Sequence, residues 1–176
     1  MKTLLIGLFL GLTSLMMNSQ IVTTMVSEEK LDEVVVSPYK NAKYFDLVND
    51  PNAPKRAIKL EKLVAKYDIT TATVFSKENS NYEVLFESEH GKVWALFNRD
   101  GEITYSNEKF EGIILPQIVV ATLKNTYPDW RLNTTKYRVN YWLNKDIKRV
   151  YEVQLIKDNK RMNLKIDNNG VLLNPK

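Results

Sequence analysis

Two segments of this chain match each other at a fixed offset. Tyr82-Glu83-Val84 opens the first segment and Tyr151-Glu152-Val153 opens the second. Farther along, Gly101 and Gly170 stand at the same offset, and the positions in between keep their apolar or polar character. An offset that holds over about twenty positions indicates an internal duplication. The chain should therefore fold as a tandem of two similar units.

Each unit is predicted to begin with a helix. The first, from about residue 55 to 67, is indicated by apolar residues at positions i, i+3, i+4 and i+7, namely Leu60, Leu63, Val64 and Tyr67. The second begins at Leu115-Pro116, because proline is tolerated in a first helical turn. It ends at Tyr127, because Pro128 disfavours the α conformation in the residue before it.

Strands are predicted to follow each helix. Tyr82, Val84 and Phe86 share one face of a strand, and the same alternation recurs in the second unit. A period of two is typical of antiparallel strands with one face in water. We predict an α+β fold of tandem duplicated helix-plus-antiparallel-meander units, at about residues 54–105 and 113–173, with the helices packed on one face of an antiparallel sheet. Each unit alone would be small for an independent core, so the two should share one continuous sheet.

The amino terminus reads as an export signal over residues 1–19. Lys2 supplies the positive charge, Leu4 to Met17 is mostly apolar, and Ser19 offers a small residue for cleavage. Because the apolar run is short for a bilayer span, we expect cleavage, no stable membrane insertion afterwards, and a periplasmic or extracellular location. An uncleaved anchor is the alternative. The chain contains no cysteine, so an exported domain must be stabilised by its hydrophobic core.

Residues 20–53 are predicted to form a flexible tether, with a β-prone segment at 31–38. Val34, Val35 and Val36 favour an extended backbone because of their branched β-carbons. This segment could pair with the sheet edge of its own domain. Alternatively, it resembles the extended segment ahead of the plug in some outer-membrane receptors coupled to TonB, which docks by strand addition.

No constellation of catalytic, cofactor-binding or metal-ligating residues is evident. His90 is the single histidine, and it stands where a hairpin turn is expected. Asp167-Asn168-Asn169-Gly170 is similar to the start of a calcium loop but lacks the glutamate at position twelve, so a hairpin turn is favoured. The 25 basic and 21 acidic residues give a net charge of +4 without a dense basic run, so nucleic acid is not an expected partner. We expect no cofactor and no enzymatic activity.

Two tryptophans are predicted to lie on the sheet face opposite the helices. Trp94 and Trp142 each alternate with apolar residues, and Leu96 and Arg138 fall on the same face. A hairpin lengthened around Asn144-Lys145-Asp146 would carry Trp142 near its tip, beyond the first unit. Exposed tryptophan and arginine are typical of binding hot spots, so these four residues are the candidate partner-binding set. The alternative is that the tether or the other unit covers them.

The domain at about residues 54–176 resembles the PepSY-like, β-lactamase-inhibitor-protein-like domains of exported bacterial proteins. The resemblance rests on Leu115-Pro116 and Tyr127-Pro128 around the second helix, on Tyr151-Glu152-Val153, and on the closing segment from Asp167 to Leu173. It implies roles in binding and inhibition, and it transfers no functional residue, because the matching positions are turn and core residues.

The leading hypothesis is therefore an exported non-catalytic module that binds an unidentified envelope or extracellular protein, with a hydrolase or peptidase that it restrains as the candidate partner. One alternative is an envelope structural or receptor-accessory protein acting through residues 31–38. Weaker alternatives are a small-molecule binder and a hydrolase with an unrecognised site.

Overall fold

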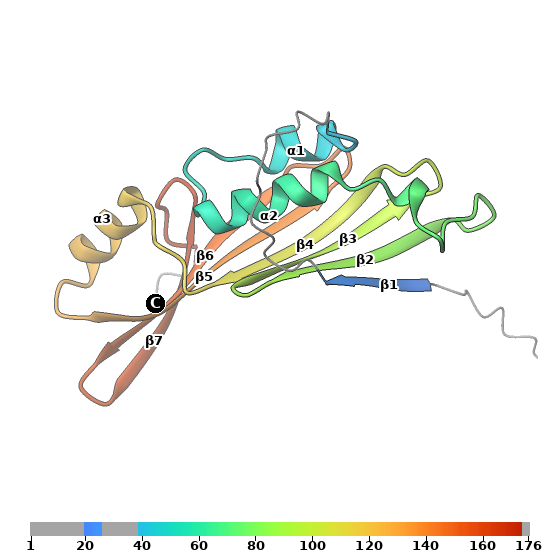
Figure 1. Cartoon of the computed structure of the whole chain (residues 1–176). Helices are drawn as coiled ribbons and strands as arrows, with labels where there is room; N and C mark the ends of the chain where they lie inside the picture. Colours follow the sequence, from blue (N-terminus) through green and yellow to red (C-terminus); the bar gives the residue numbers. More distant parts are fainter. Residues whose placement is uncertain (1–19, 26–38, 174–176) are drawn as a thin grey trace, which may run out of the picture.

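The computed structural model describes residues 39–173 in full and the backbone of residues 20–25 (Figure 1). The predicted signal and the Val34–Val36 segment lie outside these residues. The helical elements of the described part are α1 (Ala42–Val48), α2 (Lys55–Lys66), the short 3₁₀ helix η1 (Ile69–Thr71) and α3 (Gln117–Thr126). The strands are β1 (Gln20–Met25), β2 (Asn81–Ser88), β3 (Gly91–Asn98), β4 (Ile103–Glu111), β5 (Arg131–Trp142), β6 (Lys148–Lys157) and β7 (Lys160–Asp167).

The described strands form one seven-stranded sheet in the order β1 to β7. β1 runs parallel to β2, and every later neighbour pair is antiparallel. β4 pairs with β5 from Tyr105 opposite Trp142 to Glu111 opposite Lys136. This pairing joins the two halves, so the predicted α+β class, the antiparallel sheet from β2 to β7 and its continuity are confirmed.

Prolines mark the starts of α2 and α3 and the end of α3. Pro54 and Pro116 immediately precede α2 and α3, and α3 stops at Tyr127, directly before Pro128. α2 buries the stripe that contains Leu60 and Val64 and leaves its lysines exposed to water. Both predicted helices are therefore confirmed.

The core lies between the helices and one face of the sheet (Figure 1). Alternate strand residues point into it, as the period of two predicts. The largest fully buried members on the strands are Tyr82, Phe86, Phe97, Ile103, Phe110, Tyr137, Tyr141, Tyr151 and Ile166. α1 and α2 lie together over the sheet, whereas α3 sits at the β7 end, where the Thr122 hydroxyl donates to the carbonyl of Gly170.

Two turns at matching positions adopt the same geometry. The side-chain oxygen of Asn98 accepts hydrogen bonds from the backbone N–H groups two and four residues on, and Asp167 does the same. Gly101 and Gly170 both have positive φ, 78° and 80°. The offset thus relates the β2–β3 hairpin to the β6–β7 hairpin. In the second half, β5 lies between α3 and β6, but the first half has no strand between α2 and β2. A duplication of whole helix-plus-meander units therefore stays a prediction.

Part of the expected tether belongs to the folded domain. β1 and α1 both lie within residues 20–53, and Tyr44, Phe45 and Val48 of α1 are buried in the core. Asn41 fastens this segment, since its amide donates to the carbonyl of Tyr67 and its oxygen accepts from the Ile103 N–H. The prediction of a flexible tether up to residue 53 is therefore wrong for residues 39–53. α1 is short and is held by packing, so no long periodic pattern announces it.

The β5–β6 hairpin also differs from expectation. Its end does not project free of the first unit, because Trp142 pairs with Tyr105 and the Leu143 N–H donates to the Thr104 carbonyl. β4 itself continues to Glu111, past the predicted end of the first unit at residue 105. The added residues lengthen β5, which pairs with β4 from Tyr105 to Glu111.

Candidate functional site: the open face of the sheet

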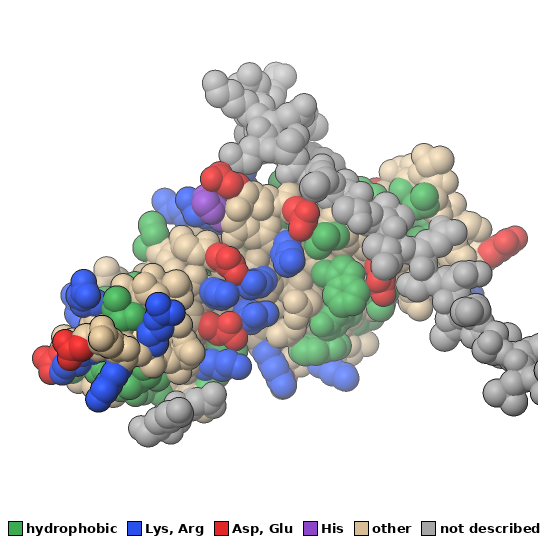
Figure 2. All heavy atoms as spheres, turned by 90° about the horizontal axis from the view of Figure 1, so that it is seen from below, with side chains coloured by type: hydrophobic (Ala, Val, Ile, Leu, Met, Phe, Trp, Pro, Cys, Tyr) green, Lys and Arg blue, Asp and Glu red, His purple; other side chains and the backbone are tan. Residues whose placement is uncertain are grey.

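Three aromatic rings from three neighbouring strands form a row on the face opposite the helices. We call Trp94 of β3, Tyr105 of β4 and Trp142 of β5 the aromatic row. The ring centroids of Trp94 and Tyr105 are 6.2 Å apart, and those of Tyr105 and Trp142 are 5.4 Å apart. Trp94 keeps 42% of its surface exposed. Figure 2 views this face and shows apolar side chains gathered beside a band of alternating positive and negative charge.

The structure brings three of the four predicted binding residues together. Leu96 pairs with Tyr105 across β3 and β4, and Tyr105 pairs with Trp142, so Leu96 adjoins the aromatic row. Arg138 shares the face but stands four positions before Trp142 on β5, about 14 Å along an antiparallel strand. Its Nε donates to Glu152 Oε2 at 2.9 Å, so its guanidinium is already paired.

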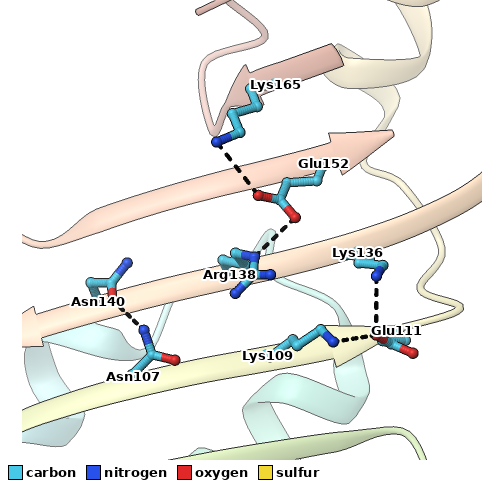
Figure 3. Close-up of polar contacts among 8 residues, drawn as sticks. All are labelled: Asn107, Lys109, Glu111, Lys136, Arg138, Asn140, Glu152 and Lys165. Atoms are coloured by element: carbon cyan, nitrogen blue, oxygen red, sulfur yellow. Dashed lines mark hydrogen bonds and ion pairs between the residues drawn. The ribbon is translucent and has the colours of Figure 1, made fainter. Parts of the chain in front are cut away.

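Arg138 belongs to a set of ion pairs that crosses β4 to β7, shown in Figure 3 and called here the charged ladder. Glu111 contacts Lys109 at 2.6 Å and Lys136 at 3.3 Å, while Glu152 contacts Arg138 and, at 3.8 Å, Lys165. The hydrogen bonds from Lys109 and Lys136 lower the pKa of the Glu111 carboxyl. Exposed pairs of this kind add little to stability.

An amide pair lies between the aromatic row and the charged ladder. Asn107 Nδ2 donates to Asn140 Oδ1 at 2.6 Å, across β4 and β5 (Figure 3). Asn107 also pairs in register with Trp94 on β3. The face thus passes from aromatic rings through neutral amides to paired charges, the ordinary sequence of an interface from its apolar centre to its polar rim.

Tyr105 was not among the predicted binding residues, and the reason is local. The register between β3 and β4 shifts between Leu96 and Phe97, which marks a bulge. Strict alternation from buried Ile103 would turn Tyr105 into the core, whereas buried Ser106 and Glu108 show that the inward positions move by one residue. The Asp100-Gly101 turn beside this position was the available signal that alternation could break there.

A second polar cluster lies on the buried face, and sequence reasoning missed it as well. Glu61 of α2 and Glu108 of β4 are both 0% exposed. The Tyr44 hydroxyl and the Ser106 hydroxyl each donate to Glu108 Oε1 at 2.8 Å. The signals were a glutamate beside the apolar stripe of α2 and another at an inward position of β4. Because neither carboxyl reaches the surface, no substrate can approach this pair, and we assign it no catalytic role.

The remaining candidates lie in turns. His90 is in the β2–β3 turn, with Nε2 3.3 Å from Glu89 Oε1. The Asp167 carboxylate accepts two backbone N–H groups, so it is engaged in its own turn. Within residues 39–173 no three His, Asp or Glu side chains gather as metal ligands would. Trp130, which follows α3, donates its backbone N–H to the Tyr127 carbonyl and lines a groove beside α3.

Comparison with known proteins gives little similarity. No protein-family model matches the chain, and no curated protein sequence matches it. Similar crystal structures include a DUF2874 family protein from Bacteroides ovatus, with 15% identity, a TM-score of 0.34, and coverage of 56% of this chain and 70% of that chain. Another is a DUF2874 family protein from Bacteroides uniformis, with 11% identity, a TM-score of 0.36, and coverage of 54% and 69%. No helix in the described residues is long and apolar enough to cross a membrane.

Proposed function

We propose that this chain is an exported, non-catalytic binding module of PepSY-like, β-lactamase-inhibitor-protein-like type. Its open sheet face binds a partner protein of the cell envelope, and the candidate partner is a hydrolase or peptidase that binding restrains. Export rests on the signal-like residues 1–19. The observation that carries the binding proposal is the contact of three aromatic rings in the aromatic row.

The aromatic row suits binding because its rings are large, partly wet and held by one another. Tryptophan and tyrosine dominate interface energetics, and truncating such an anchor costs about 2 kcal/mol or more of binding free energy. Ring contacts between Trp94 and Tyr105 and between Tyr105 and Trp142 limit the rotamers of these side chains before any partner arrives. A partner would therefore lose little entropy in ordering them.

The rigid support behind the row favours the same conclusion. On the other face of the same strands, Ala95 of β3, Ser106 of β4 and Tyr141 of β5 are buried. The Tyr141 ring meets Tyr44 of α1 edge-on at 5.3 Å. A site on strands that are backed by a packed core keeps its geometry better than one on loops.

The pairing of β1 bears on the alternative role of the Val34–Val36 segment. β1 already pairs with the outer edge of β2, from Gln20 opposite Tyr82 to Met25 opposite Glu87. Residues 34–36 would therefore find the β2 edge occupied. We propose, as the alternative to the leading function, an envelope structural or receptor-accessory protein that acts by strand addition through residues 31–38. Deleting these residues and measuring partner capture tests it.

The test uses residues 20–176 as bait in native envelope extract, with bound proteins identified by mass spectrometry. The variant Trp94→Ala/Trp142→Ala removes both ends of the aromatic row, and Trp130→Ala removes a tryptophan that lies off it. We expect one dominant partner, lost with the double variant and kept with Trp130→Ala. Thermal unfolding of each variant verifies that it is folded. Equal capture by all three baits would contradict the proposal, and inhibition of the purified partner would establish restraint.

A further inference from the structure

Glu61 and Glu108 meet across the layer between α2 and β4. Both side chains are fully buried, and the two carboxyls are close enough for a proton on one to be donated to the other. Glu108 Oε1 accepts from Tyr44 and Ser106, so α1 is tied to the same group. Neither oxygen of Glu61 has a donor among the described residues, and Glu108 Oε2 has none either.

This shortage of donors fixes the protonation of the pair. An ionised carboxylate buried without donors is strongly unfavourable, whereas a protonated carboxyl carries its own O–H donor. Burial, followed by the charge of Glu108 and the hydrogen bond to it, raises the pKa of Glu61 to about 10. Burial also raises the pKa of Glu108, against the hydrogen bonds from Tyr44, Ser106 and Glu61, which lower it. Both pKa directions favour one proton shared between the two carboxyls at neutral pH.

The charged and titratable groups around the pair would not neutralise it if the proton were lost. Arg149 of β6 favours ionisation of Glu61 and Glu108, but its guanidinium donates to the carbonyls of Leu47 and Val48 at the end of α1 and lies 4.0 Å from Asp50. The Asp50 charge opposes ionisation of Glu61. The hydroxyls of Tyr137 and Tyr151, on β5 and β6, have raised pKa values chiefly because they are buried, so they remain neutral.

We propose that the proton shared by Glu61 and Glu108 fastens the α1–α2 layer to the sheet, and that rising pH progressively releases this layer. Loss of the proton would leave two negative charges in contact inside a dry interface. It would also remove the hydrogen bond that joins α2 to β4. Opening relieves both, because the separated carboxyls reach water and ionise there. The released element is the pair of helices, since Tyr44 ties α1 to Glu108.

Hydrogen exchange of the purified chain tests the proposal. Between about pH 6 and 9, after correction for the intrinsic exchange rate, the opening constant of α1 and α2 amides should rise by up to tenfold per pH unit, the limit for one linked proton. Central amides of β5 and β6 should change less. Glu61→Gln cannot ionise and should remove the pH dependence. Glu111→Gln, at an exposed carboxyl, should leave it as in the original chain.

Two outcomes would overturn the proposal. One is helix exchange in the original chain that does not vary with pH over this range. The other is a Glu61→Gln variant with the same pH dependence. Should Glu61→Gln fail to fold, the carboxyl ¹³C chemical shift of Glu61 in the original chain decides. A shift that remains that of a neutral acid through about pH 8 supports the proposal, and one that titrates near its ordinary range refutes it.

Discussion

Tyr105 and Trp142 pair across the two strands that join the halves of the sheet, and their ring centroids are 5.4 Å apart on its open face. The contact stands where β4 meets β5. Trp94, Leu96 and Tyr105 come from the first half, and Trp142 comes from the second. The candidate binding face therefore exists only in the joined sheet, and neither half could present it alone.

Neighbouring residues on β5 should separate binding from stability. Tyr141 is fully buried, so Tyr141→Ala should lower the free energy of unfolding by about 3–5 kcal/mol, as large aromatic-to-alanine changes in cores do. Trp142 is only partly buried, so Trp142→Ala should cost about 1–2 kcal/mol while removing partner capture. Urea denaturation measures both. If Trp142→Ala lowered the free energy of unfolding as much as Tyr141→Ala does, the Trp142 ring would belong to the core.

The true start of the domain can be tested by truncation. A chain that begins at Tyr39 keeps Asn41 and α1, and it should unfold cooperatively. A chain that begins at Pro54 loses buried Tyr44, Phe45 and Val48, which are worth several kcal/mol together, and it should be largely unfolded. Circular dichroism with thermal melting distinguishes them. If the two chains were equally stable, residues 39–53 would not belong to the folded domain, and the predicted tether would extend to residue 53.

Asn41 should matter more than its surface-like residue type suggests. Its side chain satisfies the buried N–H of Ile103 at 2.8 Å and donates to the Tyr67 carbonyl at 3.3 Å. Asn41→Ala leaves the Ile103 N–H without that acceptor, at a cost of about 1–3 kcal/mol. Urea denaturation should show this loss, whereas Asn163→Ala, at an exposed position, should change stability by less than about 0.5 kcal/mol.

Two glycines with positive φ should respond differently to alanine. At Gly170 an added Cβ would lie 2.9 Å from Ile118 Cγ1 and 3.1 Å from Thr122 Oγ1. Gly112, with φ of 60°, has nothing within 4 Å of that position. Gly112→Ala should therefore cost only the backbone term of about 1 kcal/mol, and Gly170→Ala should cost more and loosen α3. Thermal unfolding compares the two variants. Equal losses of stability would show that α3 shifts to accommodate the added methyl group without a further loss.

Global stability should fall as pH rises. The pKa of Glu61 is raised by burial from its ordinary value, so its contribution is fully present below about pH 4.5 and is lost as pH rises toward about 10. The slope for one proton is at most about 1.4 kcal/mol per pH unit. Glu61→Gln should flatten the profile measured by urea denaturation at about pH 5, 7 and 9. A profile that is unchanged by this substitution would contradict the assignment of the proton to Glu61.

Periodicity predicted the elements whose pattern is long and local. The helix at residues 55–66 and the alternating strands followed from it, while prolines bounded the second helix and the Asn169-Gly170 pair predicted a turn. α1 escaped because it has 7 residues and is held by tertiary packing. Its buried aromatic residues become informative only once the sheet beneath them is known.

The candidate site was predictable only where alternation holds. It placed Trp94, Leu96 and Trp142 on one face, but the bulge near Phe97 hid Tyr105. The contact between Glu61 and Glu108 could not be predicted, for a different reason. They lie on different elements, and nothing local in the sequence states that two carboxyls will meet.

The measurement that tests the central claim most directly compares partner enrichment by the Trp94→Ala/Trp142→Ala and Trp130→Ala baits, each shown to be folded. If the open face is the binding surface, the dominant envelope partner falls at least tenfold with the double variant and is unchanged with Trp130→Ala. A partner retained by the double variant, or lost equally with both, would place the binding surface elsewhere.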